Sequence, residues 1–267
     1  MAERARGLSY EKVLYSLDSG VAHVSLNDPG TRNAISRALA EELIEALGRA
    51  GREARSVLLT GEGKGFSSGA NLAETEVDLS DPMRDAGAAL DQYLHPMVIA
   101  VQSLCIPVVT AVQGATAGVG SSLALAGDII VCGSSAYFLQ AFRHVGLVGD
   151  GGATWLLARA VGRVRAMELL LLGERLPAEK ALEWGLVNRV VPDDELRDTA
   201  WAVAKGLAAG PASLGMIKRT AWAANDCSLK HAMAAERDAQ RDASRTDDFV
   251  EGVSAFLGKR PPEFKGR

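Results

Sequence analysis

Two glycine-rich segments constrain the fold of this chain more than any other feature. They are residues 61–72, GEGKGFSSGANL, and residues 113–122, QGATAGVGSS. Each follows a short β-like run, at 56–60 and 107–112, and each continues into residues that can begin a helix. A strand–loop–helix junction leaves backbone N–H groups unpaired, with the helix dipole behind them. Two such junctions that converge can hold an oxygen atom that gains negative charge during a reaction, which predicts an oxyanion hole.

The N-terminal part of the chain alternates strand and helix signals around these segments. Residues 12–17 and 21–26 have the pattern of a β-hairpin that turns at 19–20. Ser36 is a suitable N-cap, because apolar residues recur at helical spacing after it. A further strand is predicted at 129–133, and the strands are short and rich in Val, Ile and Leu. This pattern is typical of a sheet that crossover helices bury on both faces.

Strand signals become rare after about residue 160, and helix signals replace them. We expect helices at 162–172, 178–184, 194–209, 212–224, 228–244 and 247–257. We therefore divide the chain into a core over residues 1–195 and a C-terminal helical region over residues 196–267. The apolar stripes of the helical region pack either against its own domain or, in addition, against other subunits.

Composition narrows the classes of protein that the chain can belong to. Its 267 residues, 48% of them hydrophobic, suffice for one large globular domain, and the net charge of -4 gives no basic field for nucleic acid. No apolar stretch is long enough for a membrane helix, and the N-terminus lacks the apolar region of a signal peptide. The three cysteines share no metal or redox spacing, and no His/Asp/Glu cluster has metal-ligand spacing. We expect a cytoplasmic protein without a metal, a membrane contact or a nucleic-acid partner.

Several further motifs follow one another in a specific order. They are LNDPGTRNAI at 26–35, AGDII at 126–130, AVGR at 160–163, AEKALEWGLVN at 178–188 and AFLGKR at 255–260. Together with the two glycine segments they resemble the enoyl-CoA hydratase/isomerase family, also called the crotonase superfamily, over nearly the whole chain. The resemblance implies an α/β fold of the crotonase (ClpP-like) type, a spiral of ββα units with a C-terminal helical trimerisation region. It also implies an acyl-CoA thioester substrate, with coenzyme A entering as part of that substrate and no separate cofactor, and a homotrimer or a hexamer built as a dimer of trimers.

The resemblance assigns the donors of the oxyanion hole to the main-chain N–H groups of Ala70 and Val119. Family members usually have glycine at the second position. Valine offers the same N–H, but its branched side chain restricts the backbone and narrows the pocket. One such donor typically lowers the reaction barrier by about 2.7–4 kcal/mol.

The side chains around this hole decide which reaction we expect. Hydratases of the family use two glutamates to position and activate water, and this chain has Ser122 and Phe142 at the matching positions. Because neither residue is a carboxylate, hydration by the usual route is not expected.

Asp150 matches the single acid of the family's Δ3,Δ2-enoyl-CoA isomerases, and the residues around it also resemble ring-opening isomerases of phenylacetate catabolism. One carboxylate suffices to move a proton between two carbons, since the thioester stores the charge as an enolate. Apolar neighbours are predicted to raise the pKa of Asp150, namely Phe142, Leu147, Val148 and Trp155.

Other interpretations of the same residues stay open at this level. Asp150 is also a suitable cap for the helix that follows it. The 4-chlorobenzoyl-CoA dehalogenases carry a nucleophilic aspartate at this position, so dehalogenation, thioester hydrolysis and a hydratase that uses water differently are rivals within the family. A non-catalytic acyl-CoA-binding subunit is a rival from another class. Finally, the G-x-S-x-G pattern at 65–69, followed by Asp150 and His231, has the residue order of a serine hydrolase, although it lacks the tight strand–Ser–helix turn.

The coenzyme A contacts are also carried over from the resemblance. It points to main-chain atoms of Ser68, Ala70, Asn71 and Leu72, with Ala34 near the pantetheine. Asn71 stands where the family often has aspartate, and its side chain remains able to cap. Phe256 and Lys259 match residues that reach the adenine and the 3′-phosphate, often from a neighbouring subunit.

Overall fold

The computed structural model describes residues 10–74 and 77–267. Its strands are β1 (Val13–Asp18), β2 (Val21–Leu26), β3 (Ser56–Gly61), β4 (Gly65–Ser67), β5 (Val108–Val112), β6 (Ala115–Ala117), β7 (Ile129–Gly133), β8 (Tyr137–Leu139), β9 (Arg175–Pro177) and β10 (Arg189–Val191). Its α-helices are α1 (Arg37–Glu53), α2 (His95–Gln102), α3 (Val119–Leu125), α4 (Ala153–Leu172), α5 (Ala178–Glu183), α6 (Leu196–Ala208), α7 (Ser213–Ala224), α8 (Leu229–Ala243) and α9 (Asp247–Leu257).

The strands form two sheets that grow together along the chain. One has the order β1-β2-β3-β5-β7-β10 and the other the order β4-β6-β8-β9. The successive pairs β3/β4, β5/β6 and β7/β8 each add one strand to each sheet, and α2, α3 and α4 follow these pairs in turn. The pairings between successive units are parallel. This is the predicted spiral of ββα units.

The local predictions for the N-terminal part are confirmed. The expected hairpin is the antiparallel pair β1–β2, and its turn residues Ser19 and Gly20 have φ values of 51° and 78°, as a tight hairpin turn requires. Ser36 caps α1, because its Oγ accepts a hydrogen bond of 3.2 Å from the N–H of Leu39.

The predictions after residue 150 need two corrections. Helix α4 begins at Ala153 rather than at 162, and Gly162, with φ 78° and ψ 159°, interrupts its helical backbone. Gly162 interrupts the helical spacing of apolar residues, so the sequence predicted only the part of α4 that follows this glycine. The two short strands β9 and β10 were also missed, since three residues are too few to show an alternating pattern.

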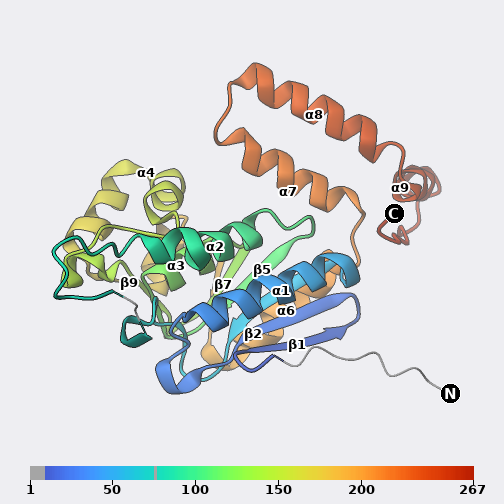
Figure 1. The fold of residues 1–267 in the computed structure, drawn as a ribbon. Coiled ribbons are helices and arrows are strands. Elements are labelled where there is room, and N and C mark those ends of the chain that lie inside the picture. The colour runs from blue at the N-terminus through green and yellow to red at the C-terminus, as the bar shows by residue number, and fades with distance from the viewer. Residues whose placement is uncertain (1–9, 75–76) are drawn as a thin grey trace.

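The six-stranded sheet is buried on both faces, as predicted. On one face, apolar residues of α6 pack against residues of β2, β3, β5 and β7. On the other face, α1 and the helices of the ββα units form the larger part of the core. Figure 1 shows α1 in front of the sheet and α6 behind it.

Helices α7 to α9 stand apart from this core (Figure 1). Helix α6, which starts at the predicted boundary of 195/196, packs on the sheet, so the separate part begins with α7; the boundary itself stays a prediction. The contact of α7 with the core includes Lys218, whose buried Nζ lies 2.9 Å from Oδ2 of Asp128 and donates to the carbonyl oxygen of Val101 at 3.0 Å. Among the helices of the described residues, none is long and apolar enough to cross a membrane.

Candidate active site

The two glycine segments converge, as the sequence predicted. A Cβ atom on Gly69 would lie 2.9 Å from the carbonyl oxygen of Ala117, and one on Gly118 would lie 3.8 Å from the Cα of Gly69. Both glycines have positive φ, 97° and 51°, which L side chains rarely adopt. The backbone therefore needs glycine at both positions, and the residues that follow them, Ala70 and Val119, are brought to the same place.

The N–H groups of Ala70 and Val119 are free in the described part of the chain. Ala70 forms an isolated parallel bridge with Ile35, in which the oxygen of Gly69 accepts at 2.7 Å and the N–H of Asn71 donates at 3.0 Å. Because these neighbours make the bonds on one side, the N–H of Ala70 itself points to the other side. Val119 is the first residue of α3, where the N–H has no acceptor within the helix.

Asn33 holds the first of these segments in place, and sequence reasoning missed it. Its side chain is fully buried, and Nδ2 lies within 3.1 Å of the carbonyl oxygens of Glu62, Gly65 and Phe66. Its own carbonyl oxygen accepts from Oγ of Ser67 at 2.7 Å. Asn33 has a φ of 55°, a left-handed conformation that asparagine tolerates better than most residues. An asparagine beside a predicted loop was the available signal.

Asp150 has a carboxyl oxygen, Oδ1, that is buried and has no hydrogen-bond partner among the described residues. This burial raises the pKa of Asp150 to about 6. The N-cap of α4 is Gly152, and no side chain caps this helix, while the main-chain oxygen of Asp150 accepts from the N–H of Ala153 at 2.9 Å. The interpretation of Asp150 as a side-chain cap is therefore wrong.

The loop that carries Asp150 packs on α3. Oγ of Ser122 donates to the carbonyl oxygen of Asp150 at 3.1 Å. A Cβ on Gly151 would lie 2.8 Å from Cγ2 of Val119 and 2.9 Å from Cβ of Ser122. The ring of Phe142 covers Gly118, since a Cβ there would lie 3.8 Å from it. The structure thus brings Asp150, Ser122 and Phe142 to α3, the helix that begins with the free N–H of Val119.

The predicted neighbours of Asp150 are correct only in part. Val148 is 84% exposed and Leu147 is also exposed, so these two side chains do not bury the carboxylate. The reason is the turn before them: Gly146 is left-handed, the N–H of Leu147 bonds to the oxygen of Phe142, and the loop runs outward. The predicted rise in the pKa of Asp150 is confirmed.

The residues expected to contact coenzyme A fall into two groups. Those of the first group surround the Ile35–Ala70 bridge, namely Ala34, Ser68, Ala70, Asn71 and Leu72. Asn71 caps the turn after it, because Oδ1 accepts from the N–H of Ala73 at 3.1 Å. Phe256, 82% exposed, and Lys259 belong to the α9 end of the chain, apart from the core (Figure 1). Within one chain they are not brought to the first group, and all of these binding roles stay predictions.

The serine-hydrolase triad is not assembled. Ser67 is buried and donates its Oγ proton to Asn33, whereas His231 lies on exposed α8, where Nδ1 pairs with Oγ of Ser228 at 3.0 Å. Within residues 10–74 and 77–267, no three His, Cys, Asp or Glu side chains group in a way that could hold a metal ion.

A cavity of about 390 Å³ lies beside the loop of Asp150, with Gly151 and Gly152 in its wall. Its apolar lining comes from α2, the end of α3, the start of α4 and α7, namely Val98, Ile99, Ala126, Trp155, Leu156 and Trp222.

The fold is that of a class of enzymes named for their enoyl-CoA substrates. A model of the family "Enoyl-CoA hydratase/isomerase" matches residues 16–267, and the chain belongs to this family. Solved structures agree with the crotonase fold: a putative enoyl-CoA hydratase from Streptomyces coelicolor A3(2) has a TM-score of 0.91 and 32% identity, covering 100% of this chain and 98% of its own. A putative enoyl-CoA hydratase/isomerase from Mycobacterium abscessus has a TM-score of 0.89 and 36% identity, covering 96% and 100%.

The curated relatives carry both isomerase and hydratase names. A 1,2-epoxyphenylacetyl-CoA isomerase from Escherichia coli is 43% identical over 96% of this chain and 99% of its own. A probable enoyl-CoA hydratase from Rhodobacter capsulatus is 39% identical over 97% and 100%. A trans-2-decenoyl-[acyl-carrier-protein] isomerase from Streptococcus mutans is 34% identical over 97% and 100%.

Proposed function

We propose that the chain is an acyl-CoA isomerase in which Asp150 moves a proton between two carbons of the substrate. The observation that carries the proposal is the carboxyl oxygen Oδ1 of Asp150, which is buried and has no hydrogen-bond partner among the described residues. It belongs to the loop that packs, through Gly151, on Val119 and Ser122 of α3. A buried carboxyl oxygen without a partner is costly, and groups of this kind are common at functional sites.

The proposed reaction begins at the thioester carbonyl. Its oxygen accepts hydrogen bonds from the N–H groups of Ala70 and Val119, and this makes the neighbouring carbon more acidic. Asp150 takes a proton from that carbon, and the charge moves to the oxygen as an enolate. Asp150 then returns the proton at another carbon of the conjugated system. A pKa of about 6 suits this exchange, because the group is ionised at neutral pH and still basic enough to accept a proton.

Hydration is less compatible with the same residues. A hydratase must hold and activate water with carboxylates, and Ser122 and Phe142 occupy the two positions where the family has them. The hydroxyl proton of Ser122 is already given to the main-chain oxygen of Asp150. Phenylalanine has no group that exchanges protons.

The relatives suggest which thioesters to test. The Escherichia coli relative is named for 1,2-epoxyphenylacetyl-CoA, and a thioester of that kind has an acidic CH₂ group between the ring and the carbonyl. Removal of a proton from that CH₂ is the same first step as in the isomerisation of a 3-enoyl-CoA. An aryl or an enoyl group is therefore the substrate class that we propose.

We also propose that the active enzyme is a homotrimer, or a dimer of trimers. The helices beyond α6 carry exposed apolar residues, namely Ile217, Leu229, Met233, Phe249, Val250, Val253, Phe256 and Leu257. A neighbouring subunit that covers them would bring Phe256 and Lys259 to the coenzyme A of the next site.

The test is product analysis with a panel of 3-enoyl-, 2-enoyl- and aryl-CoA thioesters, including 1,2-epoxyphenylacetyl-CoA. We expect an isomer of unchanged mass from at least one of them. A product that has gained water at the usual speed of a family hydratase would contradict the proposal. Release of free CoA would favour the hydrolase rival, and release of halide from a halogenated aryl-CoA added to the panel would favour the dehalogenase rival. Binding of every thioester without turnover would favour the non-catalytic rival.

A further inference from the structure

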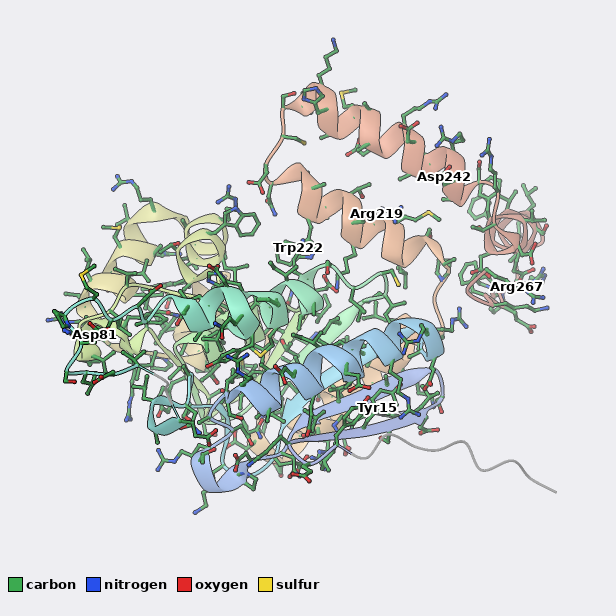
Figure 2. The ribbon with its side chains drawn as sticks, in the orientation of Figure 1. Tyr15, Asp81, Arg219, Trp222, Asp242 and Arg267 are labelled. Carbon is green, nitrogen blue, oxygen red and sulfur yellow. The ribbon has the colours of Figure 1, made fainter. Side chains whose placement is uncertain are left out.

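Trp222 contributes to the walls of two cavities. It projects from α7 toward the core (Figure 2) and lines the cavity of about 390 Å³ beside Gly151 and Gly152. It also lines a second cavity, of about 350 Å³, and among the described residues it is the one that belongs to both linings. The second cavity is largely apolar, with walls that include Pro107, Ile129, Leu207, Leu214, Ile217 and Ala221.

The first cavity lies next to the candidate active site, because Gly151 and Gly152, which follow Asp150, are in its wall. Val119, Ser122 and Ala126 recur at helical spacing along one side of α3, and Gly151 packs on the first two of them. Ala126, which follows α3, lines the cavity and lies about 10 Å along the helix axis from Val119, at 1.5 Å per residue. An acyl group that is held by its carbonyl at Val119 and follows this side of α3 must therefore be about 10 Å long to reach the level of Ala126.

The indole of Trp222 is held firmly in its position. Its Nε1 donates to Oδ1 of Asp128 at 3.0 Å, and its ring stacks on Trp155 with centroids 6.0 Å apart. The ring of Trp155 is fixed in turn, because the guanidinium of Arg159 lies 4.1 Å from its centroid and Nε1 donates to Asp226 at 3.3 Å. A wall with these contacts does not move aside easily for a longer ligand.

We propose that Trp222 determines specificity by ending the acyl-binding cavity. The end of the acyl group lies in the first cavity, and the indole keeps it out of the second. This inference rests on the proposed function, since it takes an acyl-CoA as the ligand. The proposed function alone sets no upper limit on the length of the acyl group, whereas Trp222 would set one.

The experiment measures binding of saturated acyl-CoA thioesters, from C4 to C14, by calorimetry with the full chain. Saturated thioesters cannot isomerise, so the result does not depend on catalysis. In the wild type we expect affinity to rise about fourfold for each CH₂ that is buried and then to stop rising at one chain length. Trp222→Ala joins the two cavities, so affinity should continue to rise by at least two further CH₂ groups, more than tenfold in all. Trp222→Phe keeps a ring in the wall and should retain a limit close to that of the wild type.

The matched control is Trp184→Ala. Trp184 is half-buried, like Trp222, but it lines neither cavity. Its removal should leave the chain-length limit unchanged. If Trp222→Ala loosens α7, Ile99→Trp gives a second test, because Ile99 is 58% exposed and lines only the first cavity. This larger side chain should move the limit to shorter chains.

The same limit in the wild type and in Trp222→Ala, or no limit in the wild type, would overturn the inference. Neither result would affect the proposed function, which is tested separately by product analysis and by the turnover of Asp150→Asn.

Discussion

Ser122 and Asp150 are joined by one hydrogen bond, in which Oγ of Ser122 donates to the main-chain oxygen of Asp150 at 3.1 Å. The bond attaches the loop of Asp150 to the first turns of α3, whose first residue is Val119. A glutamate at position 122 could not donate in this way when ionised. The serine therefore removes one carboxylate from the site and fixes the position of another.

The role of the Val119 N–H is tested by Val119→Pro. Proline lacks the N–H and is tolerated at the first position of a helix, which is the position of Val119 in α3. We expect kcat to fall by about 10²–10³, the usual loss for one oxyanion-hole donor. Val119→Ala keeps the N–H and should retain most of the activity, and equal losses in both variants would mean that side-chain packing matters instead.

The pH dependence of the reaction follows from the state of Asp150. A base must be unprotonated to accept a proton, so kcat/KM should rise with pH and level off above the pKa of Asp150, about 6. A pH–rate profile on an isomerised thioester checks this. A rate that is constant from pH 5 to pH 8 would mean that Asp150 is not the titrating base.

The same carboxylate should lower the stability of the folded protein. Its pKa is raised from 3.8 to about 6 on folding, so the folded state binds more protons in that range and its stability falls as pH rises through it. Asp150→Asn removes the buried charge, and it should raise the free energy of unfolding at pH 7 by on the order of 1–3 kcal/mol. Thermal unfolding of both proteins at pH 7 and near pH 4 measures this. Most of the gain in the free energy of unfolding should be lost by pH 4, where the folded-state carboxyl is protonated. A variant less stable than the wild type at pH 7 would contradict the account.

The C-terminal helices should hold subunits together. Light scattering at micromolar concentration should give a mass of three or six chains. Val253→Asp places a charge on the exposed apolar side of α9 and should shift the protein toward monomers, whereas Val164→Asp, on the exposed side of α4, is the comparison. A wild-type monomer would also remove the proposed role of Phe256 and Lys259 at a neighbour's site.

Much of the fold was predictable because its signals are local. The hairpin, the long helices and the strands at 56–60, 107–112 and 129–133 each have enough residues to show a period. The second sheet was not predictable in this way, since β4, β6, β8 and β9 have three residues each. Pairing between distant segments decides where such short strands form.

The candidate site was predictable where glycine marks it. Gly69 and Gly118 lie in the segments that the sequence singled out, and their close approach requires glycine. The surroundings of Asp150 were harder to predict, because the direction of the loop depends on Gly146 and on the contact of Gly151 with α3. The hydrogen bonds of Asn33 and the position of Trp222 were not predictable, because their partners lie far away in the sequence. Asn33 bonds to the carbonyl oxygen of Phe66, and Trp222 bonds to Asp128.

The most direct test of the central claim is the turnover of Asp150→Asn on the thioester that the wild type isomerises. Asparagine preserves the shape of the side chain but accepts no proton, and the N–H groups of Ala70 and Val119 are unaffected. We expect kcat to fall by a factor on the order of 10²–10⁴, the usual contribution of a positioned acid–base group, with little change in substrate binding. Full activity of Asp150→Asn would show that Asp150 does not carry the proton, and the proposed mechanism would be wrong.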